Sequence, residues 1–517
     1  MTEKGSARAA GRRGAACTLS VLVIASFPNR AVAEKVLVTK DGFEVFTDGR
    51  AGGFVSHGYG DGYPQPTYGY RYNANGPVLD ASGNEIPIVD ANGNPIFVTT
   101  PVHSAQEGLG FKSILDKQGL AVDPMTTGGL PVYTQGTINL TRVRTGFIGN
   151  TFGLGVRAKV TPWTTLTGYV QFWTFIENDG RQKNIANTLD ARQGYAKLDG
   201  PWGSVTIGRT RSLFSRANTD IDTMYAHRWG VGWPGALDNK GPTLGQLSFG
   251  VLGSGFSSGV IYGTPSFAGL QLNVGAFDPL QLQGYGSWQG TNYVRAEAEL
   301  TFERTLMGGS GKVVLFGNGV HQRLYKGGFC GTIDPMTLVV TPCNPDRATV
   351  AGVGYGGRLE LGRFHLGASG YYGQGLGTKY ALEVSEAAQD RGGNPRKSSG
   401  VHVQTQVVLG KFDVFAGAGI AQIYLTDYDN MTKVPDPRDT RVLSPDPAIK
   451  AMANQVFPYT VPKDQIGINA GIVYNVTPNL HADLDFFRAQ ADWFATNGFA
   501  GQKQVVWVGN AGMTVNW

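Results

Sequence analysis

Residues 294–302 read VRAEAELTF, and this stretch decides the fold. Apolar or small side chains (Val, Ala, Ala, Leu, Phe) occupy every second position, and Arg, Glu, Glu and Thr occupy the positions between them. Strict alternation is the period of a β-strand, because successive side chains point to opposite faces of a sheet. The stretch is therefore predicted to be a strand with one apolar face and one charged face.

The same alternation recurs along the chain. LHADLDFF, from Leu480, sets Leu, Ala, Leu and Phe against His and Asp, and a similar pattern starts at Val401. Segments of this kind predict about sixteen strands, each about ten residues long or longer. The expected ranges are 42–57, 138–160, 164–178, 188–199, 202–211, 257–264, 268–278, 291–303, 311–323, 347–361, 363–374, 398–410, 411–425, 464–475, 480–492 and 502–517.

The connections between these strands alternate in length. Short turns such as 161–163 and 477–479 alternate with long connections such as 212–256 and 426–463. A soluble β-sandwich also alternates apolar and polar residues, but charged ladders on the polar faces favour a water-filled interior. Lipid offers no hydrogen bonds to an open sheet edge, so a sheet that spans a membrane must close. The predicted fold is all-β, a transmembrane antiparallel β-barrel with short periplasmic turns and long extracellular loops.

Composition agrees with this fold class. The chain has 517 residues, of which 41% are hydrophobic, 16% are charged and 75 are Gly. That is too apolar for a disordered chain and too polar for a bundle of membrane helices.

The first 33 residues have the pattern of a secretory signal. A basic segment with Arg8, Arg12 and Arg13 precedes the apolar stretch 17–27, and Ala31-Val32-Ala33 matches a cleavage site. A short membrane anchor is the alternative. The expected organisation is a signal peptide at 1–33 and a barrel at 34–517. Removing 1–33 takes five basic and one acidic residue from totals of 44 and 39, which leaves a net charge of +1. Nucleic acid is therefore not an implied partner.

Cys330 and Cys343 are the two cysteines outside that leader, in the stretch CGTIDPMTLVVTPC. In an exported protein a local disulfide is the expected state, with two free thiols as the alternative. A zinc site there would lack ligands. The repeated turns at 80–84 and 90–94 fit tight-turn chemistry, and calcium binding there is the alternative.

Several motifs resemble those of the general, trimeric Gram-negative porins. The matching stretches are Arg144-Thr-Gly-Phe-Ile-Gly, Arg192-Gln-Gly-Tyr-Ala, Gly203-Ser-Val-Thr-Ile-Gly-Arg209 and the hairpin 260–269. The chain ends on aromatic Trp517, with Val515 and Met513 at alternate positions before it. This ending resembles the terminal signal read by the barrel-assembly machinery, although the family more often ends in Phe.

The resemblance implies a sixteen-stranded barrel, a homotrimer, and a third loop, here about 212–256, folded into the lumen as a constriction. Arg144 and Arg192 fall on the family's arginines of the basic wall. Alternation places Arg50 and Arg142 on the same inner face, and Arg209, the last residue of its motif, is also expected at the constriction. On the loop, Asp220 and Asp222 are the expected acidic partners. Alternatively, an inward Arg only pairs with an acid across a strand. Trp173, Trp493 and Trp507 are expected in the interfacial aromatic girdle.

The predicted function is an outer-membrane porin, a water-filled channel for passive diffusion of small hydrophilic solutes and ions. A channel specific for sugars, phosphate or carboxylates is the main alternative, and an adhesin or an outer-membrane enzyme is a weaker one. The seven histidines are scattered and none lies in a nucleophile motif, so no catalytic residues, cofactor or metal are predicted. The expected partners are two further copies of the chain, outer-membrane lipid, the barrel-assembly machinery and the solutes.

Overall fold

The computed structural model describes residues 34–67, 132–144, 149–174, 190–222, 246–279, 293–325, 332–333, 340–341, 347–379, 381–382, 388–390, 393–431, 434–435, 441, 446–452, 455–456, 462–494 and 503–517. Most of these residues lie in one large antiparallel sheet. Its strands are β1 (Lys35–Lys40), β2 (Phe43–Thr67), β3 (Val132–Arg144), β4 (Asn150–Thr161), β5 (Thr164–Thr174), β6 (Asp190–Gly200), β7 (Gly203–Arg211), β8 (Phe256–Gly263), β9 (Leu270–Phe277), β10 (Arg295–Leu306), β11 (Gly311–Tyr325), β14 (Arg347–Leu361), β15 (Phe364–Gln374), β16 (Lys397–Leu409), β17 (Phe412–Tyr424), β20 (Pro462–Asn475), β21 (Leu480–Trp493) and β22 (Lys503–Asn516).

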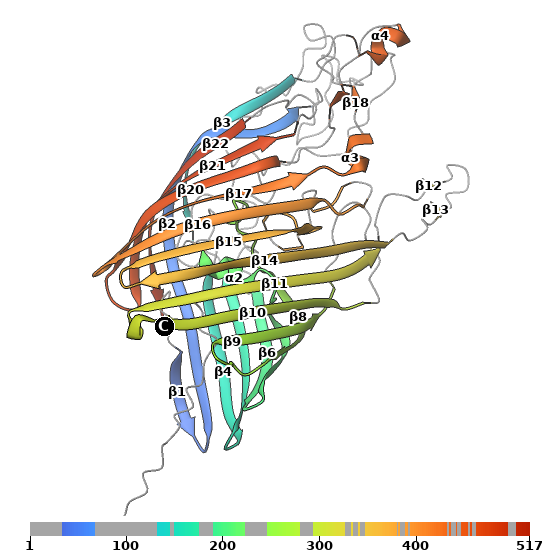
Figure 1. Cartoon of the computed structure of the whole chain (residues 1–517). Helices are drawn as coiled ribbons and strands as arrows, with labels where there is room; N and C mark the ends of the chain where they lie inside the picture. Colours follow the sequence, from blue (N-terminus) through green and yellow to red (C-terminus); the bar gives the residue numbers. More distant parts are fainter. Residues whose placement is uncertain are drawn as a thin grey trace, which may run out of the picture.

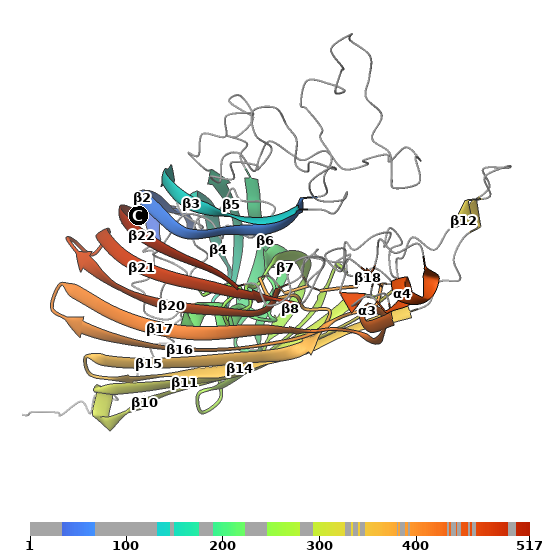
Figure 2. The same cartoon turned by 90° about the horizontal axis from the view of Figure 1, so that it is seen from above.

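The sheet closes on itself. Each strand from β4 to β22 pairs with the next one listed, and β22 pairs back with β2. The other edge of β2 pairs first with β4 and then with β3, so β3 and β4 share one position in the ring. Strand β1 pairs with the same edge of β2 as β22 does, at the end of β2 that β22 leaves uncovered. The eighteen strands therefore make a sixteen-strand barrel, which confirms the predicted fold (Figures 1 and 2).

The two faces of the strands differ as the alternation predicts. On β10, the charged residues Arg295, Glu297 and Glu299 are 0%, 4% and 2% exposed. Val294 and Leu300 are 63% and 48% exposed on the opposite face. Since lipid covers the outer face of a membrane barrel, these exposed apolar side chains belong to its lipid-facing band.

Short turns lie at one end of the barrel, and the small helices α3 (Asp427–Met431) and α4 (Pro447–Ala451) lie at the other (Figure 1). Only two residues join β4 to β5, and two join β16 to β17. Exposed aromatic side chains lie on the outer face. Trp163 and Phe267 lie in turns and are 75% and 82% exposed, while Tyr355 and Trp507 lie further along their strands. Aromatic girdles at the membrane interfaces are typical of outer-membrane barrels.

The remaining elements are small. Two-residue strands form two small two-stranded sheets, β12 (Thr332–Ile333) with β13 (Val340–Thr341), and β18 (Val434–Pro435) with β19 (Gln455–Val456). The helices are α2 (Arg216–Ile221), α3 (Asp427–Met431), α4 (Pro447–Ala451) and the 3-10 turn η2 (Met307–Gly309). In the described ranges, no helix has the length and apolar character needed to cross a membrane.

Candidate functional site: the channel interior

The third loop enters the barrel directly after β7. Its helix α2 lies against the inner side of β14 and β15. Asn218 donates from Nδ2 to the carbonyl oxygen of Gly370 at 2.9 Å, and Asn318 of β11 donates from Nδ2 to Asn218 Oδ1 at 3.1 Å. Ala217 and Ile221 bury their side chains against Phe316 of β11. The expected third loop in the lumen is therefore confirmed.

Two carboxylates of β10 hold the start of this loop. Glu297 accepts a hydrogen bond from the backbone N–H of Phe214 at 2.8 Å and pairs with Arg295 at 2.7 Å. Glu299 forms an ion pair with Arg216 of α2. The alternating acids of VRAEAELTF thus face the lumen and anchor the loop.

The returning part of the third loop, from residue 246 onward, lies against the inner side of β21. Phe249 is 1% exposed and packs edge-on against Phe487 of β21, with ring centroids 5.1 Å apart. Asp222 is also 1% exposed, and its Oδ2 accepts a hydrogen bond from the backbone N–H of Gln246 at 2.8 Å. Asp222 therefore joins the two arms of the loop instead of lining the passage, which departs from the sequence expectation.

Inward-facing glycines allow this close approach. An added Cβ at Gly354 would lie 2.5 Å from Asn218 Oδ1, and one at Gly467 would lie 2.6 Å from Phe249 Cβ. At Gly419 it would overlap the carbonyl oxygen of Phe249. Sequence reasoning missed these positions. Their signal was a Gly where alternation calls for an inward side chain, a pattern that often marks close backbone approach.

Strands β4–β7 form the wall on the other side of the barrel. There Gln171, Gln193 and Thr210 keep partial exposure, while Thr167 and Tyr169 are 9% and 8% exposed. A chain of hydrogen bonds runs across this wall. Tyr169 donates to both Asp48 oxygens at 2.9 Å, and Gln171 donates to the Tyr169 hydroxyl at 3.1 Å. Gln193 donates to Gln171 at 3.0 Å, and Thr210 donates to Gln193 at 3.2 Å. Ordered and partly solvated, this wall offers water a hydrogen-bonding surface.

Arg192 lies on this wall at a β-bulge. Gln171 pairs with Gln193 and Phe172 with Ala191, so Arg192 is the extra residue. Bulges re-aim side chains, and the Arg192 guanidinium lies 4.7 Å from the ring centroid of Trp173 and 2.8 Å from Asp190. Trp173 is 6% exposed on the inner face with Tyr169 and Gln171. Its expected place in the lipid-facing girdle is therefore wrong, whereas Trp507 is 54% exposed on the outer face.

The other expected wall arginines differ in placement. Arg50 is 7% exposed on the inner face, where its Nη2 lies 3.4 Å from Thr514 Oγ1. Positions 142 and 144 pair with the buried residues Ser56 and Phe54, but the side chains of Arg142 and Arg144 lie outside the described part of the structure.

Arg209 lies on the outer side of the wall. It is two residues from Ile207, which is 58% exposed, and it pairs with Gly194 and Ser258. We therefore leave it out of the constriction. The motif predicted an inward Arg209, but Arg209 alternates in step with Val205 and Ile207 and so shares their outer face.

The basic residues of the open wall have acidic neighbours. Asp220 of α2 pairs with Arg211 at 2.8 Å, which joins the third loop to the end of β7. The corresponding pairs on the wall strands are Lys197–Asp199 at 2.7 Å, Arg192–Asp190 at 2.8 Å, and Arg157–Glu34 at 2.7 Å with Arg157–Glu44 at 3.2 Å. The local charges therefore largely balance along the described wall.

Some residues of the sequence predictions lie outside the part of the chain that the structure describes. Cys330, Cys343 and the repeated turns at 80–94 lie outside the described residues, as does the side chain of Trp493. Among the described residues, no group of three or more His, Cys, Asp or Glu side chains is arranged to hold a metal ion.

The sequence matches the family described as Gram-negative porin over residues 98–492. No curated protein matches it significantly. Among solved structures, the outer membrane channel DcaP of Acinetobacter baumannii is 12% identical with a TM-score of 0.52, covering 93% of this chain and 100% of that chain. The anion-selective porin from Comamonas acidovorans (12%, TM-score 0.46, covering 92% and 100%) and Salmonella typhi OmpF (12%, 0.43, covering 94% and 100%) are more distant.

The DcaP likeness shows a shared fold. The family match covers more than half of the chain and agrees with the closed barrel, its lipid-facing band and its inward third loop. The chain therefore belongs to the Gram-negative porin family, as an outer-membrane protein that forms a channel for passive diffusion.

Proposed function

We propose that this porin is a general diffusion channel whose passage runs between the third loop and the wall formed by β4–β7. The observation that carries the proposal is a contrast in exposure. In the middle of the loop-covered strands inward polar residues are buried, as with Glu299 at 2%, Gln404 at 2% and Asp485 at 0%. On β6, the side chains of Asp190, Arg192 and Lys197 remain 43%, 30% and 21% exposed. Water and solutes therefore cross the barrel along the β4–β7 side of the lumen.

The balanced charges of that wall favour a general channel over a substrate-specific one. A specific anion or cation site needs convergent charges of one sign left free for the ligand. Arg192 has Asp190 and Lys197 has Asp199 within ion-pair distance, and such partly solvated pairs bind each other weakly. The residual field is small, so we expect modest ion selectivity.

Swelling of liposomes that contain the purified protein tests this proposal. Rates should fall steadily with solute size across sugars, amino acids and carboxylates of similar hydration. Saturable, much faster uptake of one chemical class would instead support a substrate-specific channel. Liposomes without protein and liposomes with heat-denatured protein are the controls.

Further parts of the proposal concern role and assembly. We propose a passive pore without enzymatic activity, assembled as a homotrimer in contact with outer-membrane lipid after removal of residues 1–33. The last residue supports the assembly role: the N–H and C=O of Trp517 both bond to Gly49, at 3.0 and 2.9 Å, next to the seam of the barrel. A terminal strand that completes the seam is a suitable segment for recognition by the barrel-assembly machinery.

A further inference from the structure

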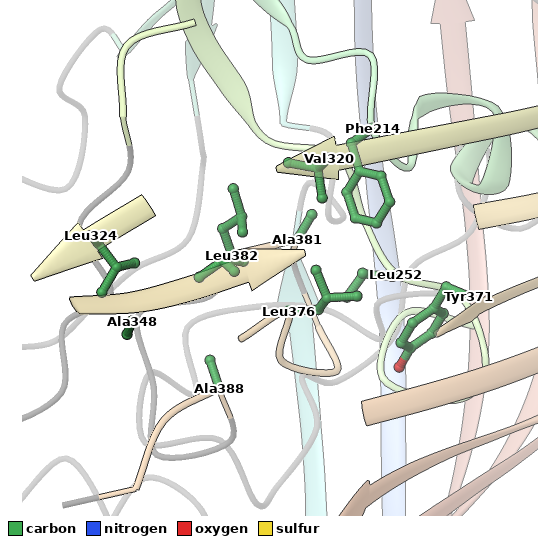
Figure 3. Close-up of a cluster of buried hydrophobic side chains, with 11 residues drawn as sticks. Phe214, Leu252, Val320, Leu324, Ala348, Tyr371, Leu376, Ala381, Leu382 and Ala388 are labelled. Atoms are coloured by element: carbon green, nitrogen blue, oxygen red, sulfur yellow. The ribbon is translucent and has the colours of Figure 1, made fainter. Parts of the chain in front are cut away.

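A second loop, residues 375–396 after β15, also enters the barrel. Its described residues Leu376 and Leu382 are 0% and 4% exposed. They pack in one apolar cluster with Phe214 and Leu252 of the third loop, and this cluster extends to inward side chains of β11, β14 and β15 (Figure 3). An apolar core inside a channel lumen removes water from one side of it. Here both loops contribute to that core.

Backbone hydrogen bonds join the two loops directly. The N–H of Gly253, in the returning arm of the third loop, donates to the carbonyl oxygen of Lys379 at 2.9 Å. The N–H of Ala381 donates to the carbonyl oxygen of Gly253 at 2.8 Å. Both bonds use the backbone of Gly253, one through its N–H and one through its carbonyl oxygen. They fix the position of the two loops relative to each other, because separating the loops would leave these backbone groups without hydrogen-bond partners.

The 375–396 loop is itself held on the wall. Leu376 lies over inward glycines: added Cβ atoms at Gly352 and Gly373 would be 2.6 and 2.7 Å from its Cδ1. Thr378 accepts a hydrogen bond from Gln465 of β20 at 3.1 Å. The described part of the loop therefore contacts the wall from β14 to β20.

A buried ion pair fixes the end of this loop. Arg396 and Asp429 are 1% and 0% exposed and form a bidentate pair, with N–O distances of 2.8 and 2.7 Å. Arg396 also donates to the carbonyl oxygen of Gln389 at 2.8 Å, and Thr426 donates to Asp390 at 2.5 Å. The 375–396 loop is thus joined to the following extracellular connection.

We propose that the 375–396 loop is a second constriction element, in which Leu376 and Leu382 position the returning arm of the third loop and so set the width of the passage. The inference rests on the proposed channel function. It adds that the third loop alone does not determine pore size.

The test compares single-channel currents of wild type, Leu376→Ala/Leu382→Ala and Leu315→Ala in planar bilayers. Leu315 is 49% exposed on the outer face of β11, so its truncation is a matched control. The double variant should keep the barrel, shown by heat-modifiable migration and a β-rich spectrum. It should also show higher unitary conductance and a noisier open state than wild type, while Leu315→Ala matches wild type.

Wild-type current and noise in a folded double variant would overturn the inference. If the double variant does not fold, Leu376→Val alone decides in its place by the same two readouts. A wild-type protein that conducts no current at all would contradict the proposed function instead, so the two failures are distinguishable.

Discussion

At the residue scale, the interior depends on where side chains are missing. Glycine at inward positions lets loop backbone lie directly on the barrel wall, and Gly419 beneath Phe249 is the tightest such contact. Because a methyl group there would overlap a backbone carbonyl oxygen, the strand or the loop must shift to accept it.

The substitution Gly419→Ala should therefore loosen the returning arm of the third loop. Overpacking of a well-packed site costs about 1–3 kcal/mol. We expect a lower thermal unfolding midpoint in detergent and a noisier open-channel current. Gly317→Ala is the matched control, since Gly317 is also a strand glycine and has no atom within 4 Å of its added Cβ. Equal behaviour of the two variants would mean that the loop does not rest on Gly419.

Arg192 supports a prediction on ion selectivity. Replacing Arg192 by Ala leaves Asp190 without its partner at 2.8 Å, so the wall gains negative charge. In a narrow passage one fixed charge alters ion entry strongly, and selectivity should shift toward cations. Reversal potentials in a salt gradient measure this shift, which should grow in Arg144→Ala/Arg192→Ala. Arg209→Ala, on the outer side of the wall, should leave the potential unchanged; an equal shift there, or none for Arg192→Ala, contradicts the assignment.

Single residues were only partly predictable from the sequence. Arg50 faces inward as alternation predicts, and the parity that puts Tyr169 and Gln171 inside also puts Trp173 inside. The role of Asp222 in joining the two arms of the third loop was not predictable, because its partner Gln246 follows 24 residues later and no local sequence pattern indicates the contact.

At the element scale, strands were predictable and loops were not. Alternation is a local signal, and each of the sixteen expected ranges overlaps a strand position of the ring. The expected strand 311–323, now β11, alternates least regularly. Its inward residues Phe316 and Val320 are apolar because helix α2 and the third loop cover them. The path of a loop depends on distant partners, and the third loop was placed only through the family resemblance.

The disulfide prediction concerns the connection that contains β12 and β13, where Thr332 pairs with Thr341 and Ile333 with Val340. Cys330 and Cys343 lie outside the described residues, so their pairing stays a prediction from the sequence of an exported protein. We expect the bond to stabilise this connection by about 2–4 kcal/mol, while the barrel survives reduction. Thiol labelling of the unreduced, denatured protein tests the bond; two labelled cysteines per chain would disprove it.

At the scale of the whole molecule, closure of the ring determines stability. Both edges of β2 and of each large strand from β4 to β22 have a partner, so unfolding must break a continuous antiparallel ladder. Purified protein should therefore give a β-rich circular dichroism spectrum and migrate in SDS as an oligomer until boiled. A monomer band without boiling would contradict only the trimer. A helix-dominated spectrum would contradict the barrel itself.

The central claim is that the barrel contains an open, water-filled passage beside its two inward loops. Single-channel recording in planar bilayers tests this most directly. The folded protein should insert with discrete current steps whose conductance rises in proportion to the conductivity of the salt solution, because ions cross with their water. Folded, heat-modifiable protein that inserts but passes no current, or whose steps saturate at low salt, would contradict an open aqueous pore.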